Sequence, residues 1–282
     1  MKFGIREICD VVLRAKSAVT IGTQSFVTDE PVIYFDSAKT STVEGASTTV
    51  YATGGRGNSR LLAWEGERTV TFTMEDALMS PLGFAILSGA GITDAAANAK
   101  INVHTTATVA STVALTKVSV DLTDAIPAGG TLALTDAYAF VLENGEIKTR
   151  LGKVTVLEAD VTDKSLEFSI PVASGIADGT AVTVLVDFYV SMASDAQEIT
   201  IEADKFAGYY YLEASTLFRR QSDGVDLPAQ FIVPKVKIQS AFKFAMAASG
   251  DPSTFTFTMD AFPDYTKFDK TKKILFALQI VG

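Results

Sequence analysis

The side chains best suited to nucleophilic or metal chemistry are scarce in this sequence. It contains one histidine, His104, and one cysteine, Cys9. A zinc site normally needs four ligands, so this pair cannot form one alone. His104 lies in an alternating, strand-like run, and the sequence contains no Gly-x-Ser-x-Gly nucleophile motif. We therefore interpret His104 as an ordinary surface or linker histidine. Cys9 lies among apolar residues, which favours a buried structural thiol over a reactive one.

A cluster of glycines at Gly54, Gly55 and Gly57 has the conformational freedom that phosphate-binding loops need. The cluster lacks the Gly-Lys-Ser/Thr ending of a P-loop and the Gly-x-Gly-x-x-Gly spacing of a dinucleotide site. The residues after it, Ser59–Val70, indicate strand, turn and strand, whereas either site requires a helix. We therefore interpret the cluster as a tight or mobile turn that supports contacts to a neighbouring molecule.

Two pairs of carboxylates, Asp260 with Asp264 and Asp223 with Asp226, have spacings that a glycosidase pair or a calcium site could use. They flank a proline and a glycine, and turns commonly contain such acids. The pattern of ligands at every second position that defines a calcium loop is absent. We predict no catalytic residues, no metal or other cofactor, and no enzymatic activity.

Most of the chain alternates apolar and polar residues with period two, which predicts β-strands. The clearest predicted strands are 70–74, 118–122, 166–170 and 255–259, followed by 199–201, 209–218, 231–238 and 274–281. Asn144-Gly145 predicts a tight hairpin turn between 140–142 and 147–149. The fold class we predict is mainly β, with antiparallel pairing.

Two segments have patterns typical of helices. The first is Ile5–Lys16, in which Ile5, Ile8 and Val12 form one apolar face. The second begins near Glu75, has Ser80-Pro81 as a start signal, and continues to Gly89.

The overall composition bounds the possible partners. The chain is 48% hydrophobic, yet its most apolar run, Ala181–Val190, is interrupted by Asp187 and is far shorter than the roughly 20 residues that span a bilayer. We therefore predict no membrane insertion and expect the apolar excess to be buried against other subunits. A formal net charge of −9 disfavours a general nucleic-acid binder but allows a wall past which nucleic acid slides.

Charge is unevenly distributed along the chain. Residues 101–195 contain 5 Lys+Arg and 12 Asp+Glu, a balance of −7, which leaves 19 and 21, a balance of −2, for the flanks. About seven short predicted strands in this segment suit an immunoglobulin-like β-sandwich, although the Cys…Trp…Cys pattern of true immunoglobulin domains is absent. The segments Gly89–Asn98 and Met192–Ala196 have linker composition. We predict that 101–195 is inserted into a core built from 1–100 and 196–282.

The flanks contain a recognisable order of elements. Val50–Asn58 and Leu62–Pro81 give a glycine-rich loop, a strand, a turn, a strand of alternating threonine and apolar residues, and a short helix. Gly250–Pro263 and a final strand complete the pattern. In texture and order the flanks resemble bacteriophage tail tube (major tail) proteins, some of which carry immunoglobulin-like domains on their outer surface.

The resemblance implies an antiparallel β-sandwich or half-barrel with a flanking helix, so that 1–100 and 196–282 form a tube core. It implies that six subunits form a ring around a continuous β-barrel, and that rings stack into a tube through which DNA passes. The implied partners are copies of the chain, other tail proteins, and phage DNA held transiently in the lumen without sequence-specific binding. The implied location is the virion tail, after synthesis in the host bacterial cytoplasm.

The polar, Ser/Thr-rich segment Val27–Val50 is predicted to be extended. That pattern suits a loop that orders against an adjacent ring, and it equally suits a plain surface hairpin. The residues we select as candidate contacts between subunits are Val32, Tyr34, Phe35, Gly54, Gly55, Arg56, Gly57 and Asn58.

A second class of function competes with the tube subunit. The chain could be a virion tail-tip or surface binding module that recognises a receptor or glycan through the inserted domain. Rings or tubes of uniform width favour the first function, whereas a persistent monomer with affinity for glycans favours the second.

Overall fold

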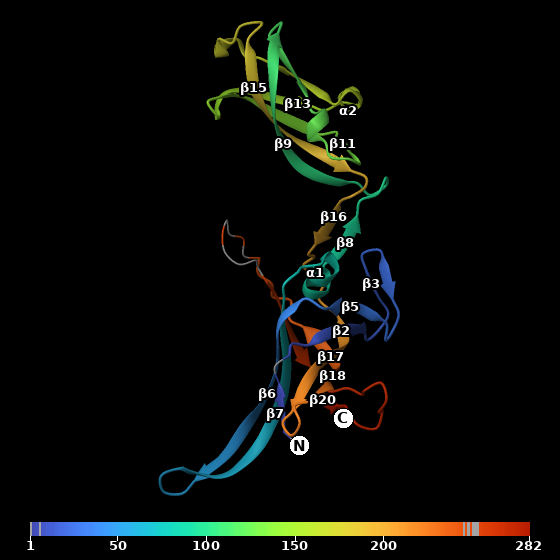
Figure 1. The fold of residues 1–282 in the computed structure, drawn as a ribbon. Coiled ribbons are helices and arrows are strands. Elements are labelled where there is room, and N and C mark those ends of the chain that lie inside the picture. Colours follow the sequence, from blue (N-terminus) through green and yellow to red (C-terminus); the bar gives the residue numbers. More distant parts are fainter. Residues whose placement is uncertain (1, 6, 245, 247–248, 250–253) are drawn as a thin grey trace. The chain divides into compact units, whose positions relative to one another are not determined.

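The computed structural model describes residues 2–5, 7–244, 246, 249 and 254–282 (Figure 1). Its contacts divide the chain into two compact units, residues 1–92 together with 199–282, and residues 93–198. We propose that the second unit is the inserted domain predicted at 101–195. Part of the tail-tube-like stretch Gly250–Pro263, namely 250–253, lies outside the described residues.

The first unit is built around a nine-stranded antiparallel sheet in the part of the chain that the structure describes. The strand order is β5-β2-β17-β18-β19-β7-β6, while β1 pairs with β17 and β20 pairs with β18. The strands are β1 Phe3–Ile5, β2 Asp10–Ala15, β5 Pro31–Phe35, β6 Ala38–Gly54, β7 Ser59–Asp76, β17 Tyr209–Arg220, β18 Asp226–Ile238, β19 Phe255–Ala261 and β20 Ala277–Ile280. A separate hairpin consists of β3 (Val19–Ile21) and β4 (Gln24–Phe26). The predicted mainly β, antiparallel fold class is confirmed.

The two faces of this sheet differ because alternate residues of a strand point to opposite sides. On one face, Phe72 and Met74 of β7 and Phe257 and Met259 of β19 are almost fully buried and lie opposite one another in register. They join one hydrophobic core with residues of β2, β5, β17 and β18. The threonines between them remain at least partly exposed on the other face, so the period-two pattern fixes which side of the sheet is solvated.

One helix covers part of the core. Helix α1 (Pro81–Ser88) begins as predicted, with the Ser80 hydroxyl accepting the Gly83 N–H at 2.9 Å and proline in the first turn. It ends at Gly89, whose left-handed φ of 72° only glycine adopts without strain. An added Cβ on Gly89 would also lie 2.5 Å from the backbone of Phe206. Most side chains of the helix are buried in the core, and residues 75–76, predicted as its start, belong to β7.

The predicted helix over Ile5–Lys16 is wrong. This segment forms β1 and β2, and β2 pairs with both β17 and β5. Val11, Leu13 and Ala15 are buried, whereas the residues between them are partly exposed, which is the period of a strand. Ile5 and Ile8, which suggested a helical face, are exposed. In a run so rich in apolar residues both periods fit, and the free edge of β17 selects the strand.

The second unit contains a seven-stranded antiparallel sheet in the order β13-β12-β15-β9-β10-β14, with β11 on β15. Its strands are β9 Ile101–Ala114, β10 Lys117–Asp121, β11 Gly130–Leu132, β12 Asp136–Glu143, β13 Glu146–Thr155, β14 Ser165–Ser169 and β15 Ala181–Met192. Short helical turns occupy Thr123–Ala125, α2 (Glu158–Asp163) and Val172–Ser174. The unit has its own core, in which Phe168 and Phe188 are the largest side chains. Its identity as an immunoglobulin-like sandwich stays a prediction.

The firmest local prediction, the Asn144-Gly145 turn, is confirmed. Both residues have positive φ, 54° and 84°, and connect β12 to β13. This is the conformation that a two-residue hairpin of the type I′ class needs. The first predicted linker, Gly89–Asn98, is more ordered than its composition suggests, because it contains β8 (Gly91–Asp94), which pairs with β16 (Gln197–Thr200) directly after the second predicted linker.

Separate cores predict that the first unit folds without the second. The Ala95 N–H donates to the Ala196 carbonyl at 2.8 Å, so residues 96–195 can be replaced by a two-residue Gly-Ser turn without moving the chain ends. We expect this deletion variant to keep a β-type circular dichroism spectrum and a cooperative thermal transition, since the two cores share no buried residue. A variant that is unfolded at low temperature would contradict the division into two parts.

Candidate assembly surfaces

Strands β6 and β7 form a long hairpin that continues beyond the rest of the sheet (Figure 1). They pair from Ala38 opposite Asp76 to Gly54 opposite Ser59. Strand β19 covers the edge of β7 only from Thr71 to Asp76, so the outer part of the hairpin is a two-stranded ribbon. We call this outer part, residues 45–70, the arm. Most of its side chains are exposed, and a ribbon of two strands is marginally stable without further packing.

The glycine cluster predicted to form a turn lies at the tip of the arm. Gly55 and Gly57 have φ of 80° and 85°, Asn58 has φ of 49°, and the Asn58 N–H donates to the Gly55 carbonyl at 3.2 Å. An added Cβ on Gly55 or Gly57 would meet no atom within 4 Å, so these glycines serve backbone conformation and not close packing. This geometry is that of a tight turn with an accessible surface, and Arg56 lies at its exposed end.

One face of the arm is apolar. Val50 lies opposite Trp64 and Ala52 lies opposite Leu62, so these four side chains share a face. Leu62 and Trp64 are 62% and 54% exposed, which is unusual for side chains of this size and type. The opposite face is more polar and includes Thr49 with Glu65, as well as Tyr51 beneath the Arg60 guanidinium at 4.0 Å. An exposed apolar strip on a ribbon without a core of its own is typical of a surface that contacts another protein.

The base of the β6–β7 hairpin is fixed by a buried carboxylate, that of Asp76. Asp76 accepts hydrogen bonds from the Ser37 hydroxyl and from the Leu78 N–H, the latter at 3.3 Å. The Ala77 N–H donates to the Ser37 carbonyl at 3.1 Å. These bonds join the residues before β6 to those after β7, so the direction of the ribbon is set by the unit from which it emerges.

Among the described strands, β5 and β6 lie at the two ends of the strand path β5-β2-β17-β18-β19-β7-β6 and have open edges, as do the short strands β1 and β20 that pair only with β17 and β18. Strand β5 pairs only with β2, and β6 pairs only with β7. Unpaired backbone N–H and C=O groups at an edge readily pair with another strand. Of the predicted contact residues on β5, Tyr34 is 66% exposed, whereas the side chains of Val32 and Phe35 are buried in the core. These two can therefore face another chain only through the backbone of β5.

Threonines line the solvated face of the sheet over β6, β7 and β19. Thr42 lies opposite Thr73, and Thr73 lies opposite Thr258, which gives a row of three hydroxyl groups. The rows on either side combine threonines with carboxylates: Glu44, Thr71 and Asp260 in one, and Thr40, Glu75 and Thr256 in the other. None of these nine residues is basic. We call this surface the threonine face.

His104 and the carboxylates Asp223, Asp226 and Asp264 form ion pairs or hydrogen bonds within the chain. His104 Nε2 lies 3.0 Å from Asp187 Oδ1 at the surface, and Lys16 pairs with Asp264 at 2.9 Å. Asp226 and Asp223 each accept two hydrogen bonds from a guanidinium, of Arg219 and Arg220 respectively, and this lowers the pKa of both carboxyl groups. Such pairs stabilise turns and strand ends and leave no free carboxylate pair for catalysis at these positions.

Two buried groups have raised pKa values for a common reason. Burial raises the pKa of the Cys9 thiol, whose predicted position in the core is confirmed although it precedes a strand and not a helix. Burial also raises the pKa of Tyr210 to about 12, because its ring packs into the core. Of its neighbours in the sequence, Tyr209 is exposed, and Lys16 and Lys267 lie over the ring of Tyr211. Neither Cys9 nor Tyr210 is ionised at neutral pH, so both act as core side chains.

Within the described residues, His, Cys, Asp and Glu form no group of three or more that could hold a metal ion. No helix in that part of the chain is long and apolar enough to cross a bilayer.

These features define a β-sheet subunit with surfaces suited to assembly. A comparison with known protein families matches residues 5–275 to the YomU/Tube protein family, and the chain therefore belongs to it. This confirms the resemblance to phage tail tube proteins and assigns the chain a structural role in a virion tail. Such a role points away from enzymatic activity. No curated protein matches the chain.

The residues selected from the sequence include the tip of the arm but neither the apolar strip nor the threonine face. The apolar strip of Val50, Leu62 and Trp64 is visible as period-two spacing on either side of the glycine cluster. The threonine face is visible as Thr-x-Thr repeats in 71–73 and 256–258. What the sequence alone could not supply was the register that aligns these repeats across three strands.

The apolar strip predicts a separation between stability and assembly. We expect Leu62→Ser combined with Trp64→Ser to leave the unfolding temperature of the isolated subunit unchanged, since neither side chain is buried in it. Self-association measured by sedimentation velocity should weaken at least about tenfold, because burying each large apolar side chain contributes roughly 1.5–3 kcal/mol. Thr49→Ala on the opposite face is the matched control. Equal association of the double variant and the wild type would count against the strip.

Proposed function

We propose that this protein assembles into rings of six subunits that stack into a tube with a channel for DNA. The observation that carries the proposal is the pair of open edges, β5 and β6, on one sheet. If β6 of one copy pairs with β5 of the next, the contact joins two different surfaces, and a contact of that kind closes into a ring when the rotation allows. Closure would pair the two edges that end the strand path and so remove them as sites of aggregation.

The arm supports the stacking of rings. Its apolar strip is too exposed for a hairpin that stays in solvent, and its length carries it beyond the sheet from which it emerges. We propose that the arm, with Gly54, Gly55, Arg56, Gly57 and Asn58 at its tip, orders against an adjacent ring. Tyr34 and the backbone of β5 would serve the contact within a ring.

The threonine face supports the channel. A sheet that closes into a barrel directs one face inward, and the opposite face here is the core of the subunit. The threonine hydroxyls and the carboxylates of Glu44, Glu75 and Asp260 offer no cation to the phosphates of DNA. A lysine, Lys237, lies beside Asp260 on the neighbouring strand β18. Such a wall repels phosphate weakly and lets DNA pass without sequence-specific binding. The acidic insertion is not needed for this effect.

The remaining partners follow from the same proposal. A tube must end on other tail proteins, and its subunits must stay soluble in the host bacterial cytoplasm until they assemble. A formal net charge of −9 favours solubility of the free subunit.

Electron microscopy tests the assembly. Purified full-length protein, concentrated and negatively stained, should show rings or tubes of uniform diameter, and averaged end views should have six-fold symmetry. Analytical ultracentrifugation of the same sample supplies the mass of the smallest closed species. A monomer that persists at the highest attainable concentration would refute the ring, and a different symmetry would refute its stoichiometry.

The channel wall can be tested by reversing its charge. Thr42→Lys with Thr73→Lys adds two cations per subunit to the threonine face, so variant tubes should retain short duplex DNA in a co-sedimentation assay, whereas wild-type tubes should not. Retention should fall steeply with salt, since it depends on counterion release. Two lysines in the second unit, Val172→Lys and Thr135→Lys, are the control for charge alone. Equal retention by both variants would show that the threonine face is not the surface that meets DNA.

A further inference from the structure

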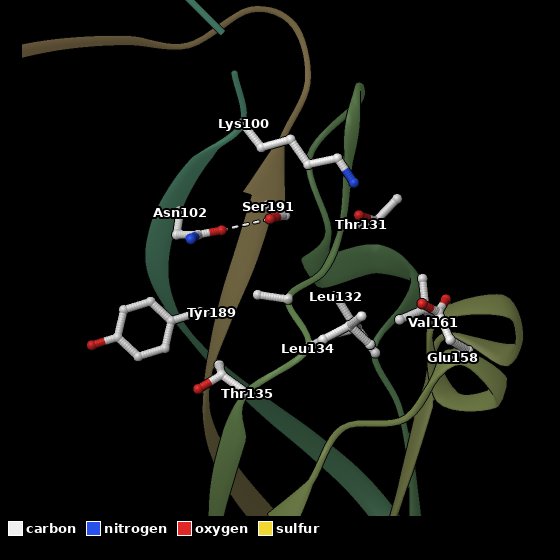
Figure 2. A pocket seen from close by; sticks show the side chains of 11 residues that line it. Lys100, Asn102, Thr131, Leu132, Leu134, Thr135, Glu158, Val161, Tyr189 and Ser191 are labelled. Atoms are coloured by element: carbon white, nitrogen blue, oxygen red, sulfur yellow. Dashed lines mark hydrogen bonds between the residues drawn. The ribbon is translucent and has the colours of Figure 1, made fainter. Parts of the chain in front are cut away.

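The second unit contains a pocket of about 410 Å³, large enough for a small organic ligand (Figure 2). Its walls come from β9, β11 and β15, from the residues that connect β11 to β12, and from α2. All of its lining residues belong to residues 93–198, so the pocket is complete within this unit. The structural role in a tube does not use it.

A row of polar side chains crosses three strands at the pocket. Asn102 of β9 lies opposite Ser191 of β15, and Ser191 lies opposite Thr131 of β11. The Ser191 hydroxyl donates to the Asn102 side-chain oxygen, which leaves the Asn102 amide N–H groups free to donate to a ligand (Figure 2). The Thr131 hydroxyl has no partner within the described part of the chain. The row therefore presents both donors and acceptors at fixed positions.

Two charged side chains of opposite sign border the pocket. Lys100 precedes β9 and extends toward Thr131, while Glu158 projects from α2 (Figure 2). Neither forms an ion pair with another described residue. A pair of unlike charges makes the site neutral as a whole, and each charge can form a strong hydrogen bond with an uncharged hydroxyl group. The balance of −7 over residues 101–195 further disfavours an anionic ligand.

Apolar surface accompanies the polar groups. Leu134 is 58% exposed and, with Ala133 and Val161, adds aliphatic surface to the lining of the pocket. Tyr189 adds an exposed aromatic ring at the margin, where the His104 ring packs against it edge-on at 5.5 Å. A pocket that combines aliphatic surface with densely spaced hydroxyl, amide and balanced charged groups matches a ligand with C–H faces and many hydroxyls.

We propose that this pocket binds a short neutral saccharide. The hydroxyls of the sugar replace water on Asn102, Thr131, Lys100 and Glu158, while its C–H groups cover Leu134. This activity is independent of tube formation, so either can fail without the other.

Isothermal titration calorimetry on the full-length protein tests the proposal with four trisaccharides. Maltotriose and tri-N-acetylchitotriose are neutral, trigalacturonic acid is anionic, and the deacetylated chitotriose is cationic. At least one neutral probe should bind at millimolar concentration, and more tightly than either charged probe. Absence of heat for both neutral probes, or preference for a charged one, overturns the proposal.

Near-isosteric variants locate the binding. Asn102→Leu with Thr131→Val removes the polar groups and keeps their volume, and should weaken binding at least about tenfold, since each lost hydrogen bond contributes of the order of a few-fold or more. Thr106→Val, also on β9 but outside the pocket, should leave affinity within about twofold. Because all three sites are at least partly exposed, folding should persist, as circular dichroism can verify. If the double variant is unfolded, Glu158→Gln on α2 is measured instead. An unchanged affinity for the saccharide in either folded variant places the sugar elsewhere and overturns the assignment of this pocket as its binding site.

Discussion

The pairing of backbone groups at sheet edges is the constraint on which the rest of this structure depends. Strands β2, β17, β18, β19 and β7 pair on both sides along at least part of their length, but β5 and β6, at the two ends of that path, each have one side open in the described chain. The cost of leaving such groups unpaired in a buried interface is large, and the readiness of edges to pair is correspondingly high. A subunit whose strand path ends in two open edges therefore has surfaces that suit pairing with further copies. Membership of the YomU/Tube family gives these edges a structural purpose.

Period-two alternation explains how much of this could be predicted. Where one face of a strand is buried, as in Val70–Met74 and Phe255–Met259, the sequence shows both the strand and its inner side, and the structure confirms them. The segment Ile5–Lys16 failed because its apolar residues satisfy two periods at once, and the choice was made by a partner strand some 200 positions away in the chain. Propensity cannot report a contact of that range. For the same reason Val32 and Phe35 looked like surface candidates until the register of β5 on β2 placed them in the core.

Local and long-range interactions determine different properties of the arm. Its turn is dictated locally, since Gly55 and Gly57 adopt conformations that other residues avoid. Its direction is dictated by the bonds around Asp76, on the opposite end of the hairpin. Its stability, however, is not supplied within the subunit, because a two-stranded ribbon with exposed Leu62 and Trp64 gains little from its own packing. Burial of that strip against another chain would contribute several kcal/mol at roughly 1.5–3 kcal/mol per large side chain, enough to order the ribbon during assembly.

Charge illustrates why composition alone misplaces function. The whole chain is acidic, and the simplest inference assigns that acidity to a channel that must not hold DNA. Most of the excess lies in residues 101–195, a unit with its own core, so these charges are not carried by the sheet of the first unit. On the surface that we propose faces DNA, nine aligned positions carry threonine, glutamate or aspartate and none carries lysine or arginine, although Lys237 lies beside Asp260 at its margin. Because DNA affinity rises with each phosphate that a cation neutralises, the absence of cations at a few aligned positions matters more than the net charge of the chain.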